Sequence, residues 1–141
     1  AVKAAEGNPG KRPLNQNEWK PRPVAPRMPA GLLPEAEGFW KRVAPLLESA
    51  KLLTEADGQA FEMMATHYAL ARRAARELRR SGALLVADEE GVLHKHPLLQ
   101  VYRDNSAQFR QWAQLFGLTP TARAKLSVPE PEDDDDAFFD D

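Results

Sequence analysis

Residues 55–81, EADGQAFEMMATHYALARRAARELRRS, decide the fold of this chain. At about 100° per residue, apolar side chains gather on one face of a helix and arginines on the opposite face. Thr54, with Asp57 three residues later, is a candidate N-cap, and Gly82 is expected to end the helix as the residue after the C-cap. The pattern predicts a long amphipathic helix over about 55–81. Its apolar face is rich in alanine, which permits close helix packing, and comprises Ala60, Met64, Ala71, Ala75 and Leu78, with Met63, His67 and Ala74 beside them.

The opposite face carries five arginines within an arc of about 120°, and only Glu77 lies close in sequence to offset their repulsion. A charged helix face is usually one that faces solvent, but such faces usually carry both acidic and basic side chains. The guanidinium group is well suited to phosphate. The pattern therefore favours a surface that faces a polyanion, with a solvated face as the alternative. We call Arg72, Arg73, Arg76, Arg79 and Arg80 the arginine stripe.

Helices are also predicted on either side of this one. PEAEGFWKRVAPLLESAK at 34–51 places Phe39, Trp40, Val43, Leu46 and Leu47 at helical spacing, and Pro45 is expected to kink this helix or split it in two. Pro97 precedes a third helix over about 98–116, whose expected buried set is Leu98, Val101, Tyr102, Phe109, Trp112, Ala113 and Phe116.

Shorter elements complete the predicted core. ALLVADEEGVLHKH at 83–96 has two apolar runs around a turn with Asp88 and Gly91, which predicts a β-hairpin. Gly117 stops the third helix, and Thr119 and Pro120 fit the start of a short final helix through Leu126. We expect a mainly α fold with three to four helices and a small β-hairpin, in a core over 35–126. A core of roughly 90 residues is modest and would gain from oligomerisation.

The two ends of the chain differ from this core. Residues 1–34 contain seven prolines and six Lys and Arg, which predicts an extended basic arm. Residues 127–141 are expected to form a disordered acidic tail, because 128–141 hold eight acids and no base. The remainder, 1–127, holds all 19 Lys and Arg against 13 acids. A basic body with an acidic tail is typical of proteins that handle nucleic acid, although a solubilising tail is an equal alternative.

Composition excludes several classes of protein. The 141 residues include no cysteine, which rules out disulfides and thiolate metal sites. No apolar run approaches the roughly 20 residues that cross a bilayer, so no membrane association is expected. The N-terminus lacks the apolar core of a secretory signal, and a cytoplasmic protein is the default expectation.

A phosphate-binding loop is suggested by GNPGKRPLN at 7–15, but its spacing is wrong. The two glycines are too close together, Arg12 replaces the magnesium-binding hydroxyl, and Pro13 does not suit a helix start. Asn8-Pro9-Gly10 is a turn sequence instead. Such a turn projects Lys11 and Arg12 as point charges that could meet phosphate.

No catalytic set emerges from the remaining residues, and we expect no enzyme and no cofactor. His67 lies on the apolar flank, where a packed, hydrogen-bonded histidine is the usual explanation. His94 and His96 on one strand face provide only two ligands for a metal. A contiguous acidic run such as Asp133–Asp136 lacks the rigid support that a two-metal nuclease needs.

Several segments together resemble the small terminase subunit of tailed bacteriophages. GNPGKRPLN at 7–15 matches the N-terminal signature of one branch, and FGLTPTARAKL at 116–126 resembles the closing motif. Between them, four further matches follow in order: Trp40 with Val43 and Pro45, LLTEAD at 52–57, Tyr68-Ala69, and His96-Pro97 where the family often has Asn-Pro. The resemblance covers about 7–126 and leaves out the acidic tail.

The resemblance implies a non-catalytic protein that assembles into a homo-oligomeric ring. Such subunits bind viral double-stranded DNA and recruit and regulate the large terminase subunit, which holds the ATPase and nuclease. The setting is the cytoplasm of the infected bacterial host. We expect Trp40, Phe109 and Trp112 to bury the core and part of the interfaces, and Phe138 and Phe139 to contact the large subunit. The expected DNA contacts are Lys11, Arg12, Arg72, Arg73, Arg76, Arg79, Arg80, Arg123 and Lys125.

Two other functions stay open at this point. One is a monomeric or dimeric DNA-binding regulator in which 98–126 acts as a helix-turn-helix-like reader. The other is a structural adaptor whose arginines bind an acidic protein. Mass in solution separates a ring from a dimer, and competition by nucleic acid separates DNA binding from protein binding.

Overall fold

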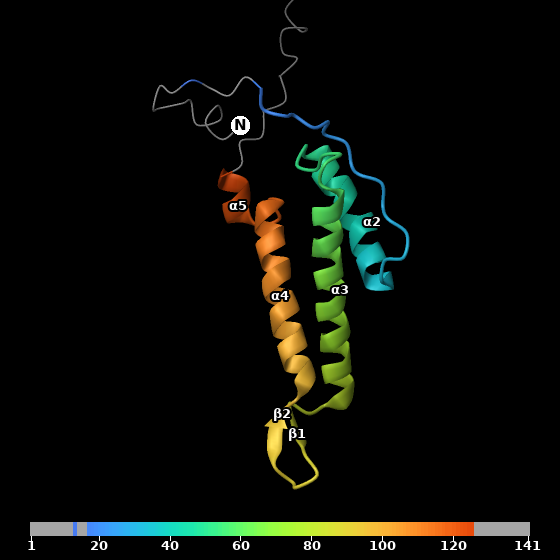
Figure 1. Ribbon diagram of the computed structural model, residues 1–141, viewed down its shortest axis with the longest axis vertical. Coiled ribbons are helices and arrows are strands. Elements are labelled where there is room, and N and C mark those ends of the chain that lie inside the picture. Colours follow the sequence, from blue (N-terminus) through green and yellow to red (C-terminus); the bar gives the residue numbers. More distant parts are fainter. Residues whose placement is uncertain (1–12, 14–16, 126–141) are drawn as a thin grey trace, which may run out of the picture.

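The computed structural model describes residue 13 and residues 17–125. Its elements are α2 (Pro34–Ser49), α3 (Gly58–Ser81), β1 (Leu85–Ala87), β2 (Leu93–Lys95), α4 (Pro97–Leu115) and α5 (Pro120–Lys125). Figure 1 shows α3 and α4 lying side by side, with α2 against α3 and α5 at the end of α4. The mainly helical fold with a small two-stranded sheet is confirmed. None of the helices in the described part of the chain has the length and apolar character needed to cross a membrane.

The long helix α3 begins later than expected. The Asp57 side chain accepts hydrogen bonds from the Thr54 backbone N (2.8 Å) and from Thr54 Oγ1 (2.9 Å), which closes a turn before the helix. Residues 55–57 therefore belong to that turn, and Gly58 is the first helical residue. The predicted end is confirmed, because Gly82 adopts φ 68° and its N–H bonds to the Leu78 carbonyl.

The helix α2 is continuous, so of the kink or split expected at Pro45, the split does not occur. Pro45 lacks the N–H that would bond one turn back, but the helix continues to Ser49. Ala44 and Leu47 are both buried, which anchors the helix to the core on each side of the proline. Tertiary packing therefore outweighs the local preference.

Phe61 is the fully buried centre of the core. Its ring centroid lies 4.6 Å from that of Trp40, 5.7 Å from Phe116 and 5.9 Å from Phe39, so α2, α3 and the end of α4 meet around it. Sequence reasoning missed Phe61, because its position falls outside the arc that the other apolar residues of α3 define. The core also includes Ala36, Ala44, Leu47, Leu53, Met64, Ala65, Ala69 and Ala113.

The predicted burial on α4 is correct for its second half and wrong near its start. Ala113 and Phe116 are buried, and Phe109 and Trp112 pack against the core. By contrast, Val101 is 38% and Tyr102 is 44% exposed. The reason is that α4 packs mainly on α3, whose own buried side chains become small alanines toward this end.

The sheet consists of β1 and β2 paired antiparallel, with Leu85 opposite Lys95 and Ala87 opposite Leu93. This confirms the predicted hairpin. Figure 1 shows it projecting from the end of the α3–α4 pair. Leu93 pairs directly with Ala87, and Leu85 is two residues before Ala87 on the same strand. Directly paired residues share a face of the sheet, as do residues two apart along a strand, so Leu85 and Leu93 lie on the same face.

Candidate nucleic-acid interface

All five side chains of the arginine stripe are exposed on the second half of α3. They share the helix face that the sequence predicts, opposite the buried Ala71 and Ala74. The structure adds partners that sequence spacing alone cannot show, and these divide the stripe into paired and unpaired arginines.

Glu35, in the first turn of α2, pairs with two of the five arginines. Its carboxylate accepts a hydrogen bond from Arg73 Nε at 3.0 Å and another from Arg76 Nη1 at 3.1 Å. The Glu35 side chain is only 14% exposed, against 46% for Arg73. The expectation that only Glu77 relieves the stripe is therefore wrong. Glu35 lies 38 residues before Arg73, so helix spacing could not reveal the pair.

The hydrogen bonds of Glu35 favour its ionised form. Its own backbone N–H is the largest cause that lowers the pKa of this carboxyl, and the hydrogen bonds from Arg73 and Arg76 lower it further against the effect of burial. The carboxylate thus accepts one hydrogen bond from each of two guanidinium groups of the stripe.

The other arginines of the stripe are less engaged. Arg80 Nη1 lies 3.2 Å from Glu77 Oε1 one turn away, with both side chains largely exposed. Within the described residues, Arg72 and Arg79 have no carboxylate in ion-pair range. Arg72, Arg79 and Arg80 are consequently the residues of the stripe most available to a phosphate.

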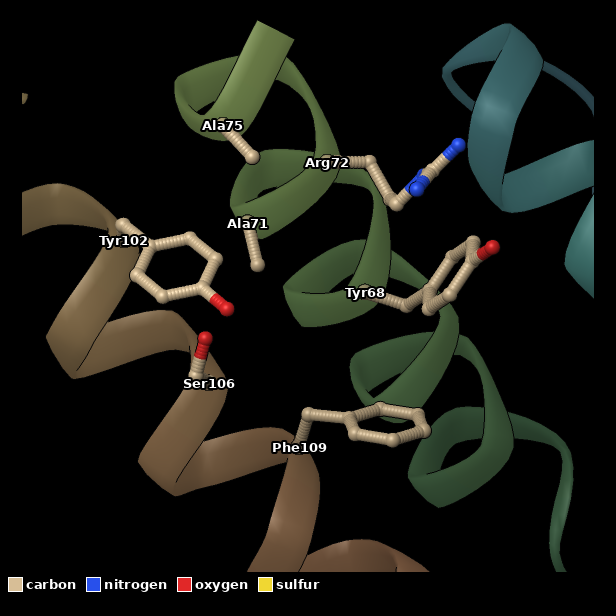
Figure 2. Close-up of a pocket in the computed structure, with 7 residues that line it drawn as sticks. All are labelled: Tyr68, Ala71, Arg72, Ala75, Tyr102, Ser106 and Phe109. Carbon is tan, nitrogen blue, oxygen red and sulfur yellow. The ribbon is translucent and has the colours of Figure 1, made fainter. Parts of the chain in front are cut away.

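A shallow pocket lies beside Arg72, between α3 and α4 (Figure 2). It measures about 250 Å³, and Figure 2 shows the Tyr102 and Ser106 hydroxyls facing each other across its α4 side. This volume is below the roughly 300–1,000 Å³ of most small-molecule sites. Arg72 is its one charged lining residue, and the other lining residues are Tyr68, Ala71, Ala75 and Phe109.

The remaining predicted DNA-contacting residues do not join the stripe. Arg123 and Lys125 are exposed on α5, and Arg123 Nη1 bonds to the Gly117 carbonyl at 3.3 Å. Figure 1 places α5 at the end of α4 opposite the hairpin, whereas the stripe occupies the half of α3 nearer the hairpin. Lys11, Arg12, Phe138 and Phe139 lie outside the described residues.

The three histidines have structural partners. His67 Nδ1 lies 2.9 Å from Asn105 Oδ1, which confirms the expected satisfied histidine. His96 Nδ1 accepts the Leu98 N–H and caps α4, so His96 does not share β2 with His94. In the described part of the chain, no three His, Asp or Glu side chains group to hold a metal.

His94 binds a carboxylate in the hairpin turn. Its Nε2 lies 2.7 Å from Asp88 Oδ2, and this hydrogen bond is the largest cause that lowers the pKa of Asp88. The backbone N–H groups of Val92, Glu90 and Gly91 add to the effect. Asp88 therefore organises the turn of the hairpin.

Fold and surface together define a mainly helical protein with an arginine-rich exterior. A family model described as phage terminase, small subunit, matches residues 36–133. The chain therefore belongs to the phage terminase small-subunit family. No curated protein and no solved structure matches it. The N-terminal segment 7–15 lies outside the matched residues, whereas the segment 116–126 lies within them.

Proposed function

We propose that this protein is the non-catalytic, DNA-binding and regulatory subunit of a phage DNA-packaging motor. It would act in the cytoplasm of the infected bacterium, bind viral double-stranded DNA, and recruit and regulate the large terminase subunit with its ATPase and nuclease. Family membership supports the packaging role. The single structural observation that carries DNA binding is the exposed arginine stripe on α3.

Phosphate contacts would dominate this DNA binding. The arginine side chains are exposed on the solvent-facing surface of α3, so the phosphate backbone of a duplex could reach them directly. Arg72, Arg79 and Arg80 would make the first contacts, because Arg73 and Arg76 are held by Glu35. Lys11, Arg12, Arg123 and Lys125 remain candidates for further contacts.

Self-association into a ring would also use the hairpin. Trp40 is buried within one chain, and Phe109 and Trp112 pack against the same core. Four large aliphatic side chains gather on the hairpin, where Leu84, Leu85, Val92 and Leu93 are each more than half exposed. An isolated two-stranded hairpin is marginally stable in water. A second copy of this chain packing on the Leu85 and Leu93 face would cover these side chains.

A charge-reversal pair tests the DNA-binding role of the stripe. Arg79→Glu/Arg80→Glu should weaken duplex binding at least about tenfold at low salt, because it replaces two phosphate contacts by repulsion. Lys51→Glu/Arg110→Glu is the matched control, since it changes net charge equally at two exposed positions away from both the stripe and the hairpin. Equal affinities for the two variants would contradict the proposal.

The large-subunit contact is tested separately. Phe138→Ala/Phe139→Ala keeps every charge of the acidic tail, so it isolates the aromatic pair. We expect it to reduce stimulation of the large-subunit ATPase while leaving DNA affinity unchanged. Full stimulation by this variant would contradict a role for the two phenylalanines.

A further inference from the structure

Arg42, on α2, folds back toward α3 over a glycine. A Cβ atom at Gly38 would lie 3.1 Å from Arg42 Nη1, so the missing side chain leaves the space through which the guanidinium passes. Arg42 Nη2 lies 3.4 Å from the Tyr68 hydroxyl on α3. The guanidinium therefore spans the seam between the two helices, although the Arg42 side chain is exposed.

Tyr68 presents its hydroxyl from a fixed ring. The ring centroid lies 4.8 Å from Phe39 on α2 and 5.7 Å from Phe109 on α4, so the aromatic body packs against the core. Such packing holds the hydroxyl at the α2–α3 seam with little loss of side-chain entropy on binding. A tyrosine hydroxyl in this setting can donate a hydrogen bond to a phosphate oxygen.

Arg72 reaches the same seam from the other helix. It follows Tyr68 by one turn on α3, and residues spaced by four lie on the same helix face. Figure 2 shows the Arg72 guanidinium directed toward α2, on the side to which the Tyr68 hydroxyl also points. Arg42 thus contacts the Tyr68 hydroxyl from α2, and the Arg72 guanidinium is directed toward the same seam from α3.

Neither Arg42 nor Arg72 has a carboxylate in ion-pair range among the residues that the structure describes. This contrasts with Arg73, next in sequence to Arg72, which Glu35 holds at 3.0 Å. Like charges that converge without a counter-charge repel one another, and an anion between them would remove the repulsion. A phosphate is the anion best matched to two guanidinium forks and a hydroxyl donor.

We propose that Arg42, Tyr68 and Arg72 form a binding site for a backbone phosphate of double-stranded DNA. This inference rests on the proposed DNA-binding function and extends its surface from α3 onto α2. It assigns a DNA contact to Arg42, a residue that the stripe on α3 does not include. It also gives two neighbouring arginines of α3 different roles, since Arg72 would bind the phosphate and Arg73 pairs with Glu35.

The test compares duplex affinity across salt concentrations for Arg42→Gln, Arg72→Gln and Tyr68→Phe in the full chain. The two arginine variants should each weaken binding about fivefold, and each should reduce the salt slope by about 0.9. Tyr68→Phe should weaken it about twofold, because it removes one donor and keeps the packed ring. Lys51→Gln, in the turn after α2, removes the same charge as the arginine variants and should change affinity less than twofold.

Three results would overturn parts of this account, and they are distinguishable. If Arg42→Gln matches Lys51→Gln while Arg79→Glu/Arg80→Glu still weakens binding, the site is wrong and the proposed function stands. If wild-type protein shows no salt-dependent duplex binding, the proposed function fails and the site with it.

Replacing chloride by inorganic phosphate at matched ionic strength identifies the ligand. Loss of DNA binding at millimolar phosphate would assign the site to free phosphate instead of DNA.

Discussion

The carboxylate of Glu35 on α2 and the guanidinium of Arg73 on α3 form a hydrogen-bonded ion pair, with 3.0 Å between Oε2 and Nε. Arg76 shares the same carboxylate. One acidic side chain thus ties α2 to α3 and neutralises part of the face proposed to meet DNA. Glu35 and a DNA phosphate would compete for the same two arginines.

The first prediction follows from this competition. Glu35→Gln should tighten duplex binding about three- to tenfold, because it releases Arg73 and Arg76 and adds one unit of net positive charge. It should also lower the free energy of unfolding by about 1 kcal/mol, as expected for two partly exposed ion pairs. Affinity measurements and chemical denaturation check the two effects.

Glu37→Gln provides the control for this prediction. Glu37 is in the same turn of α2 but pairs with Lys41, four residues along the same helix. The charge change is identical, and the stripe keeps its Glu35 partner. If both variants bind DNA equally well, Glu35 does not restrain the arginines.

The second prediction concerns pH. Because the folded state lowers the pKa of Glu35 from its ordinary value of 4.5, its ionised form stabilises the folded state at neutral pH. This contribution should be fully present above about pH 5.5 and should disappear as pH falls through the lowered pKa. The difference in unfolding free energy between wild type and Glu35→Gln should therefore shrink between pH 5 and pH 3. A constant difference over this range would show that ionisation of Glu35 does not stabilise the folded state.

The third prediction concerns the core. Phe61→Ala should lower the free energy of unfolding by about 3–5 kcal/mol, because it leaves a cavity where three other aromatic rings meet. Leu46→Ala, at a side chain that is 65% exposed, should cost less than about 0.5 kcal/mol. Similar losses for both variants would contradict the central position of Phe61.

The fourth prediction concerns self-association through the hairpin. Leu85→Glu/Leu93→Glu should convert the proposed ring into monomers, because each subunit interface would have to bury two new charges. Native mass spectrometry measures the result. Leu46→Glu on α2 is the control and should leave the assembly intact. A dimeric wild type would favour the helix-turn-helix-like regulator instead of a ring.

Residue patterns predict the elements of this fold better than they predict its contacts. The period of α3, the glycine at 82 and the turn with Asp88 each depend on neighbours within a few residues, so they can be found in the sequence. The continuity of α2 through Pro45 depends on burial against α3, which no local pattern shows.

In the candidate site, too, the sequence predicts local features better than contacts between distant residues. The stripe follows from helical spacing and is correctly placed on one exposed face. Glu35 and Arg42 were missed because their partners on α3 lie 26 to 41 residues away in sequence. Gly38 was a usable signal, since a glycine inside an amphipathic helix often marks a close approach by another group.

The most direct test of the central claim is the salt dependence of duplex DNA binding by the wild-type chain. Arg72, Arg79 and Arg80 alone would give a slope of log affinity against log salt of about −2.7 or steeper. Arg79→Gln/Arg80→Gln should make that slope shallower by about 1.8. A slope near zero for the wild type, or an unchanged slope for the variant, would contradict DNA binding through the arginine stripe.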